Sequence, residues 1–384
     1  MTKNWNYLAT GATAPLSIPV YEACSKYLDE NRDEGFKYYS QVGDIVDEPK
    51  VLFGKLVNCE PYELSIIPNS THGINLVAQM VGALKGDNVV ISELEYYGCA
   101  YPWLRLANDG VDVRIAKSKQ GRVPFENIEK LVDDKTKALS IVHVCHSGFR
   151  QDLRRLSKLA HDHGAFMATD AIGTCGVIDV DVKETGVDFL STSSYKWLLG
   201  LSGSGFLYVR KGLIDSLEPP LPGSQATPKI NGAMFMDLSP TWEKVPFAKN
   251  SARKFETGMP AVLSAISLTA SIKLLLSIGM KNVQKRVSDL TQYAIEKMEQ
   301  IGLDVVTPRE RDERGAHLIV AMDEEKKVKA DKISSALFKK KIHTQAFFPP
   351  YCSSYGSLFV APDFFNNEEE IDALAREIKI LTSR

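Results

Sequence analysis

The chain has 384 residues, of which 44% are hydrophobic and 24% are charged, and its formal net charge is −2. This size permits one large hydrophobic core plus a smaller one, and the near-neutral charge gives no basic field that would recruit nucleic acid or an anionic membrane. Six scattered cysteines without a CxxC pair, no metal-ligand motif, and no signal peptide or membrane span together indicate a cytoplasmic globular protein.

Short apolar strands alternate with helical patterns in the first half of the chain. The clearest helical pattern between them covers residues 152–163. Alternation of this kind is typical of an α/β domain with a mostly parallel sheet and helices on both faces. The predicted strands are 88–92, 111–115, 138–144, 165–169, 188–191 and 205–210.

The second half of the chain has a different pattern. Residues 217–249 are rich in proline and glycine and indicate a long excursion. Helical periodicity then returns from Pro260 to Gln300. A strand at 318–322 and helices at 332–341 and 368–381 complete the chain. We therefore predict a large α/β domain at residues 18–255 and a small α+β domain formed by residues 1–17 and 256–384.

Two polar residues stand where predicted apolar strands end. Asp170 follows the strand at 165–169, and Lys196 follows the strand at 188–191. Open parallel sheets place their chemistry at the carboxyl ends of their strands. A lysine amine forms a Schiff base with an aldehyde cofactor, and an aspartate holds a protonated pyridinium. The pair predicts pyridoxal 5'-phosphate (PLP) as the cofactor, with Lys196 and Asp170 as the catalytic residues.

A phosphate site is predicted at the start of the apolar helical run 74–84. Ser70 and Thr71 precede this run, and free N–H groups at a helix start bind phosphate at the positive end of the helix dipole. Taken alone, these two residues are better explained as an ordinary helix cap. Ser193 and Tyr195 would add hydroxyl donors to the phosphate, and they also fit an ordinary turn after a strand.

Taken together, these segments resemble the class V aminotransferase-fold enzymes. This PLP-dependent family includes cysteine desulfurases, kynureninases and isopenicillin N epimerase-like proteins. The resemblance extends from residue 7 to residue 372 and includes the segments 95–103 and 148–153. It implies the type I PLP-dependent transferase fold and a homodimer with active sites shared between subunits. It also implies a small-molecule amine or amino-acid substrate.

The resemblance assigns roles to individual residues. Lys196 takes the Schiff-base position, Asp170 the position that pairs with the pyridine nitrogen, and Tyr96 the position that stacks on the ring. His146 would lie near the cofactor hydroxyl, and Thr257 would replace a residue that reaches the partner subunit's phosphate. The implied cofactor-binding residues are Ser70, Thr71, His72, Tyr96, His146, Asp170, Ser193, Tyr195, Lys196 and Thr257.

One departure from the family pattern concerns the substrate. Phe359 stands where members that act on α-amino acids often carry an arginine that binds the substrate carboxylate. A phenyl ring cannot replace a bidentate guanidinium–carboxylate pair. Either another arginine binds the carboxylate, or the substrate presents none there. The candidate arginines are Arg253, Arg150 and Arg105.

The reaction type is less defined than the cofactor. An aminotransferase is the favoured interpretation, by analogy with the fold class. The alternatives are a PLP-dependent lyase, cysteine desulfurase or epimerase, and, less favoured, a catalytically degenerate PLP-binding protein. Cys352 is the only candidate persulfide acceptor of a desulfurase, but its surroundings do not resemble the desulfurase loops.

Overall fold

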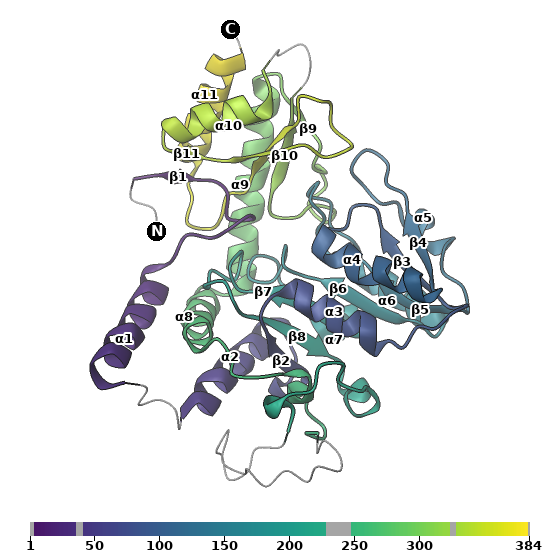
Figure 1. Cartoon of the computed structure of the whole chain (residues 1–384). Coiled ribbons are helices and arrows are strands. Elements are labelled where there is room, and N and C mark those ends of the chain that lie inside the picture. Colours follow the sequence, from purple (N-terminus) through teal and green to yellow (C-terminus); the bar gives the residue numbers. More distant parts are fainter. Residues whose placement is uncertain (1–3, 36–40, 228–246, 323–327, 383–384) are drawn as a thin grey trace.

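The computed structural model describes residues 4–35, 41–227, 247–322 and 328–382. Figure 1 shows two units, a larger one built on a wide sheet and a smaller one near the C-terminus, with the long helix α9 (Met280–Gln300) extending from one to the other. This is the predicted α/β architecture with a smaller α+β domain.

The large sheet has seven strands in the order β2-β8-β7-β6-β5-β3-β4. The pairs β7–β6, β6–β5, β5–β3 and β3–β4 are parallel, whereas β8 is antiparallel to both of its neighbours. The strands are β2 (Leu64–Ile67), β3 (Asn88–Ser92), β4 (Asp112–Ala116), β5 (Thr136–Ser140), β6 (Phe166–Asp170), β7 (Phe189–Ser193) and β8 (Gly205–Val209).

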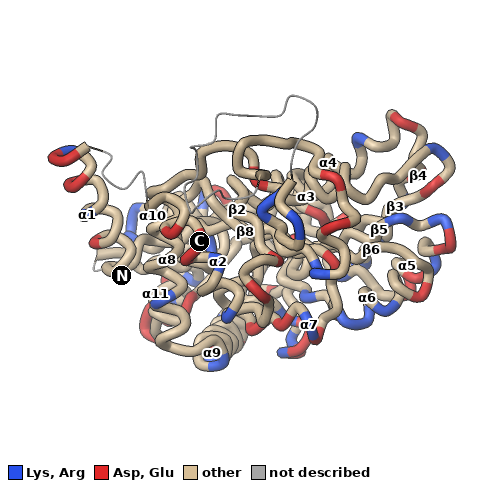
Figure 2. The backbone as a smooth tube through the Cα atoms, turned by 90° about the horizontal axis from the view of Figure 1, so that it is seen from below, with Lys and Arg blue, Asp and Glu red and all other residues tan. Residues whose placement is uncertain are grey.

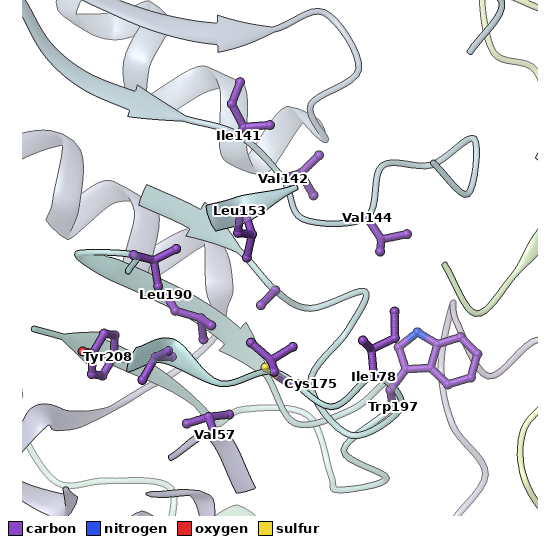
Figure 3. Packing of buried hydrophobic residues seen from close by; sticks show 14 of the residues in the cluster. Val57, Ile141, Val142, Val144, Leu153, Cys175, Ile178, Leu190, Trp197 and Tyr208 are labelled. Carbon is purple, nitrogen blue, oxygen red and sulfur yellow. The ribbon is translucent and has the colours of Figure 1, made fainter. Parts of the chain in front are cut away.

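Alternate strand residues face two separate hydrophobic clusters, because successive side chains of a strand point to opposite faces of the sheet. Leu139, Met167 and Leu190 belong to one cluster, part of which Figure 3 shows, and Ala138 and Ala168 belong to the other. The first cluster includes residues of α2 (Val42–Val57), α6 (Leu153–Asp162) and α8 (Val262–Ile278). The second includes residues of α3 (Ser70–Met80) and α4 (Tyr97–Leu106). Helices therefore cover both faces of the sheet. Because both faces are buried, the strand sequences are nearly continuous apolar runs.

The small unit is built on a four-stranded antiparallel sheet in the order β12-β13-β10-β9. Its core is a separate hydrophobic cluster to which α9, α10 and α11 contribute apolar faces. The elements are β9 (Asp304–Val305), β10 (Leu318–Ala321), α10 (Ala330–Lys339), β12 (Gln345–Phe347), β13 (Ser357–Val360) and α11 (Glu368–Thr382).

An N-terminal segment, residues 6–14, runs between the two units, and we call it the strap. It begins with β1 (Asn6–Tyr7), which pairs in parallel with β11 (Ile342–His343) of the small unit. The Ala361 N–H then donates to the Leu8 carbonyl. At its other end the Ala14 N–H donates to the carbonyl of Tyr195 at 2.8 Å. The strap therefore joins the small unit directly to the residue that precedes Lys196. Helix α1 (Ile18–Glu34) follows it.

The predicted helix from Pro260 to Gln300 is two helices, α8 and α9, which meet at an angle of 81°. Gly279 lies at the junction with φ +85°, a backbone conformation that glycine adopts without steric cost. Leu268 and Ile272 of α8 pack in the large-sheet cluster, so α8 lies with the large unit although the predicted boundary assigns it to the small one. The boundary itself stays a prediction. Within the described residues no single helix is long and apolar enough to cross a membrane. The bent α8–α9 pair reaches the required length and apolar composition only when its two helices are taken together.

One other predicted segment differs from the structure, and another lies partly outside the described residues. The strand predicted at 138–144 ends at Ser140, beyond which the chain diverges into the loop that lines the site, although the His143 N–H still donates to the Asp170 carbonyl. Of the predicted excursion at 217–249, residues 228–246 lie outside the described residues.

Basic and acidic residues are interspersed around the backbone in Figure 2.

The minor helices complete the large unit. They are the α-helices α5 (Phe125–Glu129) and α7 (Val182–Thr185), and the 3-10 helices Pro61–Glu63, Ala107–Asp109, Lys211–Ser216, Ser224–Ala226 and Ala252–Phe255. Among the described residues no group of three or more His, Cys, Asp or Glu side chains is arranged to hold a metal ion.

Candidate active site

A cavity of about 810 Å³ opens at the carboxyl ends of β5, β6 and β7. Its lining comes from both units, with Gln345, Phe347 and Phe359 contributed by the small sheet. Eight of the predicted site residues line this cavity, namely Ser70, Thr71, Tyr96, His146, Asp170, Ser193, Tyr195 and Lys196. The structure thus brings together residues that lie more than 100 positions apart in the sequence.

Lys196 lies in the tight turn that follows β7. The turn is closed by hydrogen bonds from the Leu199 N–H to the Lys196 carbonyl and from the Gly200 N–H to the Ser194 carbonyl, both 2.9 Å. Leu199 has φ +59°, a left-handed conformation that is unusual for a residue with a Cβ. Burial lowers the pKa of Lys196, while the nearby Asp170 carboxylate acts in the opposite direction. A lowered pKa raises the fraction of neutral amine, the form that attacks a carbonyl.

Asp170 ends β6 and is 3% exposed. Its Oδ1 accepts a hydrogen bond from the Ile172 N–H at 2.7 Å, and its Oδ2 accepts one from the Cys99 thiol at 2.9 Å. Burial raises the pKa of Asp170, whereas these hydrogen bonds and the charge of Lys196 lower it. The carboxylate is therefore held in one orientation by two donors, as a group that must face a cationic ring nitrogen requires.

Cys99 is a site residue that the sequence analysis did not identify. It lies on α4, is 2% exposed, and lines the cavity beside Asp170. Burial raises the pKa of its thiol well above the usual value, and the Asp170 charge acts in the same direction. The thiol is therefore kept protonated and acts as a donor. The only feature of the sequence that pointed to Cys99 is its position inside the segment 95–103, which resembles a cofactor-binding segment of the family.

The N-terminus of α3 provides the candidate phosphate site. The Asn69 side chain caps this helix by accepting from the His72 N–H at 2.9 Å. Ser70 is tied to β7 twice, because its N–H donates to Ser193 Oγ at 2.7 Å and its carbonyl accepts from Ser191 Oγ at 2.9 Å. The Ser70, Thr71 and Ser193 side chains consequently lie together in the cavity wall, next to the positive end of the helix dipole. His72 does not line the cavity.

Tyr96 lies at the N-cap position of α4, lines the cavity and is 66% exposed. The preceding residue, Glu95, is buried and anchors this segment. Its carboxyl accepts from Ser92 Oγ at 2.8 Å and from the Val142 N–H at 3.0 Å. Burial raises the pKa of Glu95 to about 8. The backbone of Tyr96 is thus held beside the cavity by its buried neighbour Glu95, while its ring lies 5.9 Å from the ring of Tyr97.

His146 connects the cavity to the loop between β12 and β13. Its Nδ1 lies 2.8 Å from the Tyr351 hydroxyl, and the two rings are stacked with centroids 5.4 Å apart. Burial lowers the pKa of His146 to about 4, so the imidazole is neutral near pH 7. Cys352, the next residue in that loop, is half-buried and does not line the cavity. Burial raises the pKa of its thiol.

The predicted carboxylate-binding arginines lie elsewhere. The Arg150 guanidinium donates to the Asp312 carbonyl, and Arg253 is buried with its Nη2 donating to Gln225 Oε1 at 2.7 Å. Neither these two residues, nor Arg105, nor Thr257 lines the cavity. Their proposed roles remain predictions.

Comparisons with known proteins agree with this geometry. The family model described as aminotransferase class-V matches residues 6–357. A probable cysteine desulfurase from Methanothermobacter thermautotrophicus is 32% identical over 292 residues, which cover 74% of this chain and 70% of that protein. An uncharacterized aminotransferase, YcbU from Bacillus subtilis, is 29% identical over 381 residues, which cover 98% of this chain and 94% of that protein.

Solved structures show the same fold. A cysteine desulfurase from Thermococcus onnurineus superposes with a TM-score of 0.85 at 22% identity, covering 98% of this chain and 94% of that one. The cystine C–S lyase C-DES, in complex with its reaction product cysteine persulfide, gives 0.86 at 16% identity, covering 98% of each chain. A C-DES variant holding glycine covalently linked to its PLP cofactor gives 0.85 at 15% identity, covering 98% of this chain and 97% of that one.

Proposed function

The chain belongs to the aminotransferase class-V family of PLP-dependent enzymes, and from that membership we propose that it is a lyase related to the cysteine desulfurases, one that releases its leaving group instead of storing it on a cysteine. Such an enzyme breaks a bond near the amine-bearing carbon of its substrate and recovers its cofactor unchanged in every turnover. The observation that carries the proposal is the buried Asp170 carboxylate and the Lys196 amine facing one cavity beside the N-terminus of α3.

The residues present fit PLP. The cofactor has a cationic ring nitrogen, an aldehyde and a phosphate, and each finds a suitable group in the cavity wall. The Asp170 carboxylate suits the nitrogen, the Lys196 amine suits the aldehyde, and Ser70, Thr71 and Ser193 suit the phosphate. When bound, PLP supplies an electron sink that allows bonds at the amine-bearing carbon to break.

The chain's own residues then have separate tasks. Asp170 keeps the ring nitrogen protonated by offering a fixed negative charge. The Lys196 amine would hold the cofactor's aldehyde, and when free it would take a proton from the amine-bearing carbon of the substrate. The electron pair of that C–H bond would form a double bond to the neighbouring carbon as the bond to the leaving group breaks. The leaving group would depart with the electron pair of its own bond and take up the proton that Lys196 removed. Tyr96 would cover the ring and exclude water.

The cysteines of the cavity favour release of the leaving group over its storage on the protein. Cys99 and Cys145 line the cavity, but both thiols are buried and hydrogen-bonded, to Asp170 and to Ser147 respectively. Burial raises the pKa of each, which disfavours the thiolate that attacks sulfur. Cys352 lies outside the cavity lining. A persulfide carried by the enzyme is therefore not part of this proposal.

An aminotransferase is the second candidate. It is supported by the description of the family model and by the likeness to YcbU along 98% of the chain. The two reactions differ in what happens to the cofactor. An aminotransferase retains the amino group on PLP and stops until an oxo acid accepts it, whereas a lyase returns to its starting form without a second substrate.

Multiple turnover without an oxo acid is the decisive measurement. Purified holoenzyme is mixed with an excess of L-cysteine, cystine, cysteamine or other small amines, and the absorbance of the cofactor and the product per subunit are followed. A lyase gives many equivalents of product and recovers its spectrum. One equivalent of product, with a spectrum that recovers only when an oxo acid is added, would overturn the lyase proposal in favour of the aminotransferase.

The Lys196→Ala variant tests the assignment of the amine. We expect its turnover to fall close to background, because no other lysine lines the cavity among the described residues. The matched control is Lys281→Ala, on the exposed surface of α9, which should behave as wild type. Retained turnover of Lys196→Ala would refute the role of Lys196.

A further inference from the structure

The wall that the small unit contributes to the cavity is neutral and largely apolar. It contains Phe347 of β12, Phe359 of β13 and His317, which precedes β10, and it also contains the polar, uncharged side chain of Gln345 on β12. The rings of His317 and Phe359 lie against each other with centroids 4.7 Å apart, and the ring of Phe347 lies 5.3 Å from that of His146. Two pairs of aromatic rings, His317–Phe359 and His146–Phe347, thus line the same cavity as Lys196.

Phe359 is fitted to its surroundings. Gly11 of the strap lies against the outer edge of its ring, so that a Cβ at position 11 would be 2.7 Å from Phe359 Cζ. The same Cβ would be 3.1 Å from Cζ2 of Trp197, the residue after Lys196. The ring therefore occupies the space that a side chain at position 11 would fill. The phenyl ring of Phe359 therefore fits only because position 11 is a glycine.

This wall has no strong positive charge. Among the described residues that line the cavity, no arginine is present, and Lys196 is the only lysine. Burial lowers the pKa of His317 to about 3 and that of His146 to about 4, so both imidazoles are neutral near pH 7. A carboxylate that left water to lie against these rings would lose its hydration without gaining a cationic partner, which is costly.

We propose that the Phe347–Phe359–His317 wall selects an amine whose group facing Phe359 is neutral and apolar, and that it rejects α-carboxylates. The inference rests on the proposed function in one respect, namely that an amine reacts at the Lys196 site. It deepens that function by naming the substrate class. Decarboxylated amines, or amines in which the carboxylate is replaced by an uncharged group, fit this wall better than the corresponding α-amino acids do.

Matched pairs of ligands test the inference in the wild-type holoenzyme. Each pair consists of an amino acid and the same compound without its carboxylate: L-cysteine and cysteamine, L-alanine and ethylamine, L-phenylalanine and phenethylamine. The concentration that produces half of the absorbance change of the cofactor is measured at equilibrium. We expect the amine of each pair to act at a concentration about tenfold lower than its amino acid.

The outcomes are distinguishable from a failure of the proposed function. If the amino acids bind more tightly than their decarboxylated partners, the wall does not reject carboxylates and the inference is wrong. If neither member of any pair changes the absorbance, the proposed reaction of amines at Lys196 fails, and the inference, which rests on that reaction, fails with it.

The Phe359→Arg variant provides an independent test, with Phe359→Leu as the control that keeps the wall neutral. A guanidinium at position 359 should reverse the preference, so that the amino acid of each pair binds about tenfold more tightly than the amine. The leucine variant should retain the wild-type preference. The melting temperature of each apoprotein shows whether the variant is folded. An unchanged preference in a folded Phe359→Arg protein would count against position 359 as the determinant.

Discussion

Replacing Gly73 by alanine tests how the start of α3 is held against the sheet. A Cβ at position 73 would lie 2.1 Å from Ser191 Oγ and 2.8 Å from Ile67 Cδ1, where ordinary contacts begin at 3.4 Å. The Ser191 hydroxyl cannot turn away freely, because it donates to the Ser70 carbonyl at 2.9 Å. Helix α3 must therefore move outward by more than about 1 Å, or the hydrogen bond must break.

The cost follows from these contacts. Adding a methyl group to a closely packed site costs about 1–3 kcal/mol, and losing a buried hydrogen bond costs about 1 kcal/mol more. The same displacement moves Ser70 and Thr71, which form the candidate phosphate site. Because about 1.4 kcal/mol corresponds to a tenfold change in an equilibrium constant, we expect PLP affinity to fall about tenfold or more.

Two measurements check this reasoning. PLP is titrated into the apoprotein and followed by absorbance, and the free energy of unfolding of the apoprotein is measured in urea. The matched control is Gly212→Ala, since a Cβ at that position would meet nothing within 4 Å. A Gly73→Ala protein that is destabilised yet binds PLP with wild-type affinity would show that the N-terminus of α3 does not hold the phosphate. Removing the obstructing hydroxyl with Ser191→Ala should restore part of the lost affinity.

Three further predictions follow from buried polar groups. Lys50→Met leaves Glu256 without the cation that lies 2.9 Å from its Oε1, and it should lower the free energy of unfolding by about 3–5 kcal/mol. The double variant Lys50→Met, Glu256→Gln should lose less stability than the sum of the losses of the two single variants. Additive losses in urea unfolding would contradict the pairing. Cys99→Ala removes a hydrogen-bond donor that lowers the pKa of Asp170, so the pKa of Asp170 should rise. The acidic limb of a pH titration of the cofactor absorbance should then move to higher pH. Cys99→Ser, which keeps a donor, should preserve the wild-type titration. Burial raises the pKa of Glu95 from 4.5 to about 8, so its contribution to stability is present below pH 4.5 and is lost as the pH rises toward 8. The melting temperature of Glu95→Gln should therefore depend less on pH across that range than the melting temperature of the wild type. The same pH dependence in both proteins would refute this role of Glu95.

Local signals account for much of what the sequence predicted. Lys196 and Asp170 follow apolar strands, and Ser70 precedes an apolar helix, so their neighbours in sequence indicated where they would lie. The structure confirms the α/β fold and brings these residues to one cavity. The break of the long helix at Gly279 also has a local signal, a glycine inside a helical pattern, although the periodicity on both sides of it predicts one continuous helix.

Contacts between distant segments were not predictable in the same way. The hydrogen bond from Cys99 to Asp170 joins residues 71 positions apart, and the hydrogen bond between His146 and Tyr351 joins residues 205 positions apart. The direction of a long side chain also depends on its partners, as with Arg150 and Arg253, which bond to groups outside the cavity. Residue type indicated a possible charge for each arginine, but not the place where the charge lies.

The strap has a consequence for how the protein is made. Residues 6–14 leave the ribosome well before the residues that they bind, at 342–343 and 361, which are synthesised more than 300 positions later. The large sheet, which ends with β8 at Val209, can form while translation continues, since domains generally fold as units during synthesis. The strap cannot dock at both ends until residues 342–361 have been made. The lysine turn thus receives its final hydrogen bond after the scaffold that presents it has formed, and a nascent chain that stops before residue 342 should contain the sheet without a finished catalytic pocket.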